Sequence, residues 1–174
     1  MGVSEERIAA TLIDFLVGNR VKSVSYLTFS EMVSNPISIR EQCIFRGLEA
    51  AGIRLAGRYA VSCHRETVAE MRRLLAGRPD ALCCFTDELA NSAVTALMEC
   101  GSGVDELPVI GIDGLEMPFN ALPLTSVRNP VEDIIFSGWQ LFENALLHDK
   151  YAAVELSARM VLRDTTPGFR LPDR

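Results

Sequence analysis

Short apolar runs alternate with longer stretches that carry apolar residues at helical spacing along most of this 174-residue chain. The runs "DALCCF" at 80–85 and "LPVIGI" at 107–112 are uninterrupted, as strands buried on both faces are. Between them, "DELANSAVTALMECG" at 87–101 has the period of a helix and closes on a glycine. The two patterns recur at intervals of roughly 25–35 residues, the size of a βαβ unit. We therefore predict an α/β fold, with a doubly wound, mostly parallel sheet and helices on both faces.

The same reading extends over the whole chain. Helical segments are predicted at 5–18, 39–52, 66–77, 87–101 and 129–147, and strands at 21–29, 57–62, 80–85, 107–112, 123–127 and 154–166. We find no internal repeat and no long linker, and a chain of this length buries enough surface to fold without a disulfide or metal staple.

Charge and cysteine content narrow the possible partners and the compartment. The net charge of −6 disfavours contact between this chain and phosphate backbones or anionic membranes. The N-terminus carries acids where a signal peptide carries bases, and no apolar run is long enough to cross a membrane. Five cysteines without a C-x-x-C pair are typical of free, buried thiols. We predict a cytoplasmic protein.

Motifs of common catalytic and cofactor sites are absent from the sequence. We find no G-x-G-x-x-G after a strand, no Walker A sequence and no G-x-S-x-G elbow. His64 and His148, the two histidines, lack metal-ligand spacing to a cysteine or an acid. A phosphoacceptor receiver domain is disfavoured as well, because the first strand is not followed by an acidic pair. We predict no metal, no cofactor and no enzymatic activity; hydrolysis by Asp87 or Asp113 is the weakest hypothesis.

Two acids stand at the carboxyl ends of predicted strands, which is where open α/β sheets bind ligands. Asp87 also begins a helix, so we expect its carboxylate to cap that helix, with or without a ligand role. Asp113 is followed by a loop, so capping explains it less well and a ligand contact is favoured. Thr86 offers a hydroxyl to the same space.

Four motifs in order, "CCFTDELANSAVTALMECG", "LPVIGIDG", "PLTSVRNPVEDI" and "MVLRDTTPG", resemble the effector-binding core of the LacI/GalR family of bacterial transcription regulators. That core is similar in fold to periplasmic sugar-binding proteins. The resemblance covers nearly the whole chain and is most specific over 81–131. Each motif alone is weak, whereas four in register are strong.

The resemblance implies two lobes around a small-molecule cleft, a helix-turn-helix head that binds operator DNA, and a homodimer. By position, Asp113 resembles the family's aspartate that binds ligand hydroxyls or ring nitrogens. Thr86 stands where members place a polar ligand contact, and Asn129 stands at the crossover between lobes. His64, next to Cys63, lies where several members stack an aromatic ring on the ligand. The implied effector is sugar-like or nucleoside-like.

The resemblance also divides the chain, and by this resemblance we expect the chain to lack the DNA-binding head and the first part of the N-terminal lobe. Residues 1–18 correspond to the end of the N-terminal lobe, 19–128 to the C-terminal lobe, 129–150 to a returning N-lobe helix, and 151–174 to the final strand and tail of the C-terminal lobe. The apolar face of the returning helix should then be exposed. That face comprises Ile134, Ile135, Trp139, Phe142 and Leu146.

One departure from the family concerns a ligand-binding arginine. The family places it three residues before a helix glycine; here the glycine is Gly47 and Ile44 holds that position. Arg40 lies one turn earlier on the same face and is the candidate substitute, with a solvated surface charge as the plainer alternative. Arg46 is the worse candidate, because its position in the helical repeat places it on a different face from Ile44.

Two functional hypotheses remain. The first is the effector-sensing domain of a LacI/GalR-type regulator, without catalysis, in which effector binding shifts a conformational equilibrium. The second is a stand-alone cytoplasmic module that binds a sugar-like molecule and has no DNA role. Both explain every feature of these 174 residues, so only the missing N-terminal context separates them.

Overall fold

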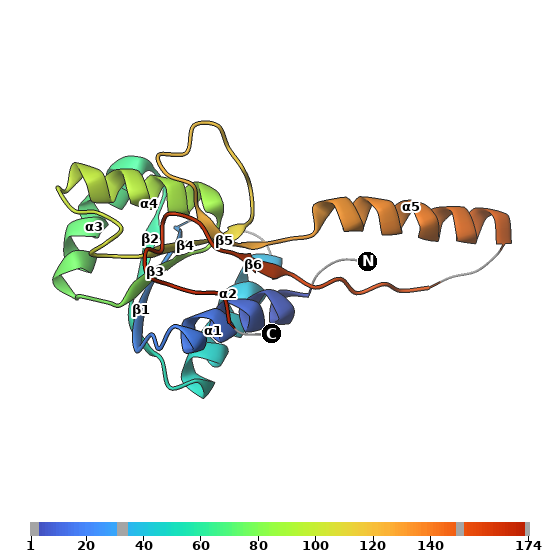
Figure 1. Cartoon of the computed structure of the whole chain (residues 1–174), viewed down its shortest axis with the longest axis horizontal. Coiled ribbons are helices and arrows are strands. Elements are labelled where there is room, and N and C mark those ends of the chain that lie inside the picture. The colour runs from blue at the N-terminus through green and yellow to red at the C-terminus, as the bar shows by residue number, and fades with distance from the viewer. Residues whose placement is uncertain (1–3, 31–34, 149–151, 173–174) are drawn as a thin grey trace.

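The computed structural model describes residues 4–30, 35–148 and 152–172, and for residues 35–38 it describes the backbone alone. Figure 1 shows a layered body and an arm that projects from it. The helices are α1 (Glu5–Gly18), α2 (Asn35–Ala50), α3 (His64–Ala76), α4 (Asp87–Glu99) and α5 (Val131–His148). The strands are β1 (Ser23–Phe29), β2 (Arg54–Val61), β3 (Ala81–Cys84), β4 (Val109–Asp113), β5 (Thr125–Arg128) and β6 (Arg159–Val161).

The strands form one sheet in the order β2-β1-β3-β4-β5-β6. The pairs from β2 through β5 are parallel, and β6 runs antiparallel to β5. In Figure 1, α3 and α4 cover one face of the sheet and α1 and α2 cover the other. The predicted doubly wound, mostly parallel fold is therefore confirmed. This order brings the carboxyl ends of β3, β4 and β5 to one edge.

The uninterrupted apolar runs became the central strands. Every residue of β3 is buried, as are the first four of β4, because helices cover both faces there. Several predicted bounds differ from the structure. β2 begins at Arg54 rather than 57, and the final strand is only Arg159–Val161. Beyond Val161 the predicted strand makes isolated bonds rather than a ladder: the N–H of Val109 donates to the carbonyl of Thr165 at 2.8 Å, and Thr165 Oγ1 donates to the carbonyl of Val109 at 2.7 Å.

Helix α1 packs closely against α2 because Gly47 has no side chain. A Cβ at Gly47 would lie 2.7 Å from Cγ1 of Ile13 on α1. On the same helix Leu12, Phe15 and Leu16 are fully buried in the shared core. The lobe boundary drawn at residue 18 stays a prediction, although α1 shares this core with the segment after it.

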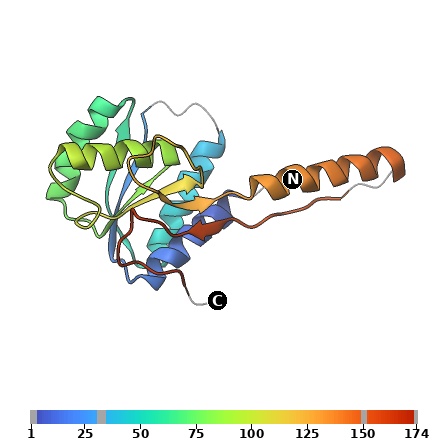
Figure 2. The same cartoon turned by 45° about the horizontal axis from the view of Figure 1, so that its top comes forward.

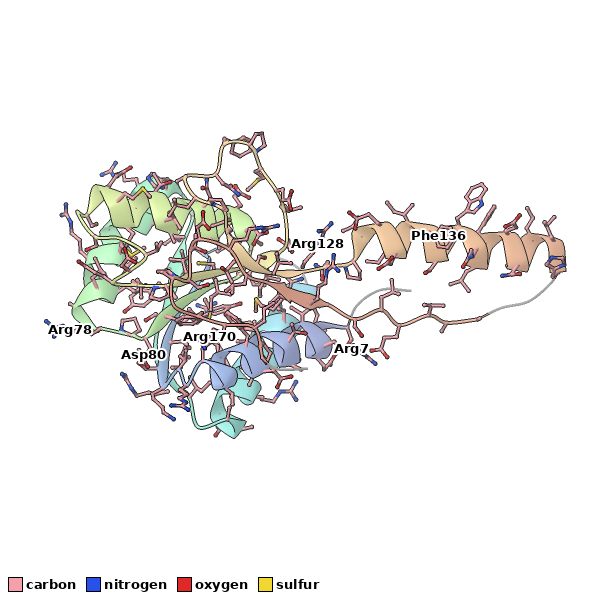
Figure 3. The ribbon with its side chains drawn as sticks, in the orientation of Figure 1. Arg7, Arg78, Asp80, Arg128, Phe136 and Arg170 are labelled. Atoms are coloured by element: carbon pink, nitrogen blue, oxygen red, sulfur yellow. The ribbon has the colours of Figure 1, made fainter. Side chains whose placement is uncertain are left out.

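The arm consists of α5 and the extended chain that returns toward β6 (Figures 1 and 2). At its base, the guanidinium of Arg7 donates to the Glu155 carboxylate at 2.7 Å and to Ser157 Oγ at 3.0 Å. No residue of α5 is buried. Figure 3 shows Phe136 pointing away from the body. Four residues of the predicted apolar face are exposed as expected, and Ile134 is half-buried.

Within the described ranges, the helices are all too short or too polar to cross a membrane.

The close approach of α1 and α2 generates a test of packing. We expect Gly47→Val to lower the free energy of unfolding by about 1–3 kcal/mol, because the new side chain overpacks against Ile13. Urea denaturation measures the change. Gly103→Val is the matched control, since a Cβ there meets nothing within 4 Å and a change within about 0.5 kcal/mol is expected. Equal losses in both variants would contradict this account.

The exposed arm generates a second test. Ile135 is 68% exposed, Trp139 66% and Phe142 58%. Changing these three residues to Ser should reduce concentration-dependent self-association in sedimentation velocity, because contiguous exposed apolar surface promotes it. The free energy of unfolding of the body, measured by urea denaturation, should stay within about 0.5 kcal/mol of the wild-type value. A large loss of stability would mean that α5 packs on the body in solution.

Candidate functional site

The candidate site lies where β3, β4 and β5 end. Asp113 is the last residue of β4 and has a φ of 127°, a backbone conformation that residues other than glycine rarely adopt. Gly114 follows at φ 76°, and a Cβ there would collide with Arg128 on β5. Strained backbone of this kind concentrates at binding sites, where the surrounding structure must hold it in place.

Asp87 holds this strained turn. Its side chain is fully buried, and Oδ2 accepts a hydrogen bond of 2.6 Å from the backbone N–H of Leu115. Its Oδ1 accepts one of 2.6 Å from the hydroxyl of Ser126, whose oxygen in turn accepts the N–H of Gly114 at 3.0 Å. Gly111 makes room for it, because a Cβ on that residue would collide with the Asp87 carboxylate.

Burial raises the pKa of the Asp87 carboxyl, and the bonds from Ser126, Leu115 and Gly114 only partly lower it. The expectation that Asp87 caps α4 is wrong. The N-cap is Thr86, whose Oγ1 accepts the N–H of Leu89 at 3.3 Å. Asp87 is the first helical residue, and its carboxylate reaches across to the β4 and β5 ends instead. The ligand role predicted for Thr86 stays a prediction.

Arg40 joins α2 to this site. Its Nε donates to the Glu5 carboxylate at 2.6 Å, and its Nη2 donates to the same group at 3.3 Å. Its Nη1 donates to the carbonyl of Phe85 at 3.3 Å and lies 3.8 Å from Oδ1 of Asp113. The guanidinium carbon is 4.9 Å from the centre of the Phe85 ring. The side chain is 13% exposed, so the alternative of a solvated surface charge is wrong. Ile44, which holds the position of the family's ligand-binding arginine, is fully buried.

Asp113 is poorly solvated and incompletely neutralised. The pKa of its carboxyl is raised to about 6, chiefly by burial and also by the nearby charges of Asp87 and Glu5. Arg40 and the backbone N–H of Asp87 lower this pKa without cancelling the effect of burial. The ionised carboxylate therefore remains a strong hydrogen-bond acceptor with part of its capacity free for a ligand.

Asn129 meets Asp113 beside a cavity of about 400 Å³. Its backbone N–H donates to the Asp113 carbonyl at 3.3 Å. Its Oδ1 is buried and has no hydrogen-bond partner among the described residues. Figure 3 places Arg128 where the body meets the arm, one residue before Asn129. The cavity is lined by Asp113, Gly114, Leu115, Glu116, Arg128, Asn129, Val131 and Glu132.

His64 lies in a different cavity, of about 390 Å³, between α3 and α4. Its Nδ1 is 2.8 Å from Ser92 Oγ and its Nε2 is 3.0 Å from Glu99 Oε1. The structure therefore does not place His64 in the Asp113 cavity, and its ligand role stays a prediction. The neighbouring Cys63 is exposed, so the expected burial of all thiols is wrong for that residue.

Sequence reasoning missed three members of the site: Glu5, Phe85 and Ser126. Glu5 was assigned to the other lobe, and only its place on α1 beside α2 brings it to Arg40. Ser126 lies in the short strand β5 beside Thr125, where a hydroxyl carries no recognisable pattern. Carboxylates, a guanidinium and an amide of this kind can bind a polar ligand. Within the described residues, no group of three His, Cys, Asp or Glu could hold a metal ion.

Comparisons with known proteins agree on one family. The sequence profile of the periplasmic binding protein-like domain matches residues 13–166. The chain is 29% identical over 157 residues to the HTH-type transcriptional repressor PurR of Mannheimia succiniciproducens. That alignment covers 85% of this chain and 47% of the relative, so the chain spans about half the length of the curated relative it matches.

Solved structures share the fold. Transcription regulator GntR from Chromobacterium violaceum superposes with a TM-score of 0.78 at 23% identity, over 97% of this chain and 65% of that one. A LacI family regulator from Arthrobacter sp. FB24, in complex with lactose, gives 0.76 at 18% identity over 93% and 63%. One from Enterococcus faecium with bound ribose gives 0.77 at 15% over 97% and 65%. The predicted resemblance to the effector-binding core is thereby confirmed.

The raised pKa of Asp113 generates a pH-dependent prediction. Its folded pKa of about 6 exceeds the ordinary 3.8, so its favourable contribution is present below pH 4 and is lost as pH rises to about 6. Asp113→Asn should remove that part of the pH dependence. At pH 7 it should stabilise the fold by about 1 kcal/mol, after allowance for solvent screening of a side chain that is 28% exposed.

Urea denaturation between pH 4 and 7.5 measures this effect. The matched control is Asp105→Asn, which neutralises an exposed acid in the loop before β4. If the two variants show the same change in stability from pH 4 to 7, burial of Asp113 is not its cause.

Proposed function

We propose, because this chain belongs to the periplasmic binding protein-like domain family, that it is the effector-sensing domain of a LacI/GalR-type transcription regulator. It binds a small sugar-like or nucleoside-like molecule and performs no catalysis. The observation that carries the proposal is the ion pair of Arg40 with Asp113, at 3.8 Å, on the carboxyl edge of the sheet.

The chemistry of the site suits a polyhydroxylated ligand. Asp113 and Asn129 offer acceptor oxygens to hydroxyl or ring N–H donors, and Leu115 and Val131 add apolar surface to the same cavity. The structural relatives from Arthrobacter and Enterococcus carry lactose and ribose. These ligands support a sugar-like effector for this chain.

The geometry also suggests how binding could be transmitted. Asn129 donates its N–H to the Asp113 carbonyl and lies two residues before α5 begins. A ligand that contacts Asp113 and Asn129 therefore acts on the base of the arm. Binding would favour one orientation of α5 over another, provided that the ligand has different affinities for the two. In a homodimer, that shift would reach DNA-binding heads.

The regulatory part of the proposal concerns residues beyond these 174. Operator DNA would be bound through a helix-turn-helix head, because the chain itself carries a charge of −6. Sequencing the reading frame upstream of the Met1 codon tests this. An open frame that encodes such a head supports a cytoplasmic regulator. A stop codon and a ribosome-binding site directly before Met1 would leave a stand-alone binding module.

The ligand-binding part is tested on the chain itself. A panel of neutral sugars and nucleosides is titrated against labelled protein, with the backbone amide of Gly114 followed by NMR. For any ligand that binds, Asp113→Ala should weaken affinity by about tenfold or more, because a charge-assisted hydrogen bond is lost. Asp105→Ala, the matched control, should leave affinity within about twofold. Binding that is insensitive to Asp113→Ala would exclude this edge as the site.

A further inference from the structure

Anionic side chains outnumber cationic ones at the Asp113 site. The carboxylates of Glu5 and Asp113 both lie beside the guanidinium of Arg40, and the charge of the buried Asp87 also acts on Asp113. Among the described residues that line the adjoining cavity, Glu116 and Glu132 add two carboxylates and Arg128 adds one guanidinium. The site as a whole is therefore negative when its carboxyl groups are ionised.

Arg40 is not available to an anionic ligand. Glu5 accepts from both Nε and Nη2, at 2.6 and 3.3 Å, which is the forked pairing that a ligand carboxylate or phosphate would need. The remaining Nη1 donates to the Phe85 carbonyl and faces Asp113. An acidic ligand would have to displace Glu5, whose side chain is only 19% exposed.

The cations beside the cavity are occupied too. Arg128 donates to Glu132 at 2.8 Å, and Arg163 donates to Glu116 at 2.7 Å. Both glutamates line the cavity with Asp113 and its neighbour Asn129. The amide oxygen Oδ1 of Asn129 is buried there without a described partner. The two cationic side chains beside the cavity, Arg128 and Arg163, are thus each paired with a glutamate.

We propose that the effector is a polyhydroxylated molecule bearing a protonated amino group, such as an amino sugar, whose ammonium lies between the Asp113 carboxylate and the Asn129 amide oxygen. This inference rests on the proposed function and specifies the ligand of the same site. The ammonium supplies three donors to the oxygen acceptors beside the cavity, and its charge adds to that of Arg40, which approaches the Asp113 carboxylate only to 3.8 Å. Phosphorylated or carboxylated sugars are disfavoured by the same charges.

Matched pairs of sugars test the charge directly. D-glucose with D-glucosamine, D-galactose with D-galactosamine and D-mannose with D-mannosamine are titrated at pH 7, where the amines are largely protonated. Backbone amide shifts of Gly114 and Asn129 report binding in the whole chain. In at least one pair we expect the amino sugar to bind about tenfold more tightly than its parent. Added salt should reduce this preference.

Variants separate a charge effect from a shape effect. Asp113→Asn keeps the size and an acceptor oxygen, so it should remove the tenfold preference while the parent sugar still binds. Asp105→Asn removes the same charge from the loop before β4 and should retain the preference. Retention of the preference in Asp113→Asn would overturn the assignment of the ammonium to Asp113.

Each remaining outcome is decisive. If parent sugars or nucleosides bind at this edge and no amino sugar binds better than its parent, the proposed amine is wrong and the sensing function stands. If D-glucose 6-phosphate binds more tightly than D-glucosamine, the charge argument is wrong. If no sugar, amino sugar or nucleoside shifts Gly114 or Asn129, both the amine and the sensing function fail.

Discussion

The buried carboxylate of Asp87 is the interaction on which the site depends. It begins α4, yet its two oxygens accept hydrogen bonds from the Leu115 N–H and the Ser126 hydroxyl, each at 2.6 Å. These bonds tie a helix to the ends of two neighbouring strands. They also hold Asp113 at a φ of 127°. Without these hydrogen bonds, burial of the carboxylate would cost several kcal/mol. Loss of either bond would therefore destabilise the turn.

Charge at the site follows from packing. Because α1 lies against α2, Glu5 reaches Arg40 and takes its forked donors. Asp113 is then left 3.8 Å from a guanidinium that is already paired, in a partly buried position that raises its pKa to about 6. This partly compensated carboxylate stands next to the base of the exposed arm. In the proposed function, it would couple ligand binding to a change in the orientation of the arm.

The fold could be predicted from the sequence because its main signals are local. Uninterrupted apolar runs gave β3 and β4, helix periods gave α1 through α5, and their alternation predicted a parallel sheet. The spacing around Trp139 also predicted the apolar face of α5, and the family resemblance predicted that this face is exposed. Bounds were less accurate where pairing depends on partners distant in sequence. The last strand shortened to Arg159–Val161, because beyond it the chain makes isolated backbone and hydroxyl bonds, such as those between Thr165 and Val109, rather than a ladder.

By itself the sequence determined the sheet, the edge at which we propose that a ligand binds, and the acids Asp87 and Asp113 at that edge. The sequence could not show whether Asp87 caps α4 or bonds to the neighbouring strand ends, because both roles use a carboxylate at the start of a helix. Only the tertiary structure decided that Thr86 caps α4 while Asp87 reaches Ser126, 39 residues away. It also decided that Arg40 is paired with Glu5. Periodicity identifies which face of an element is buried, whereas the partner of a polar group depends on contacts between distant segments.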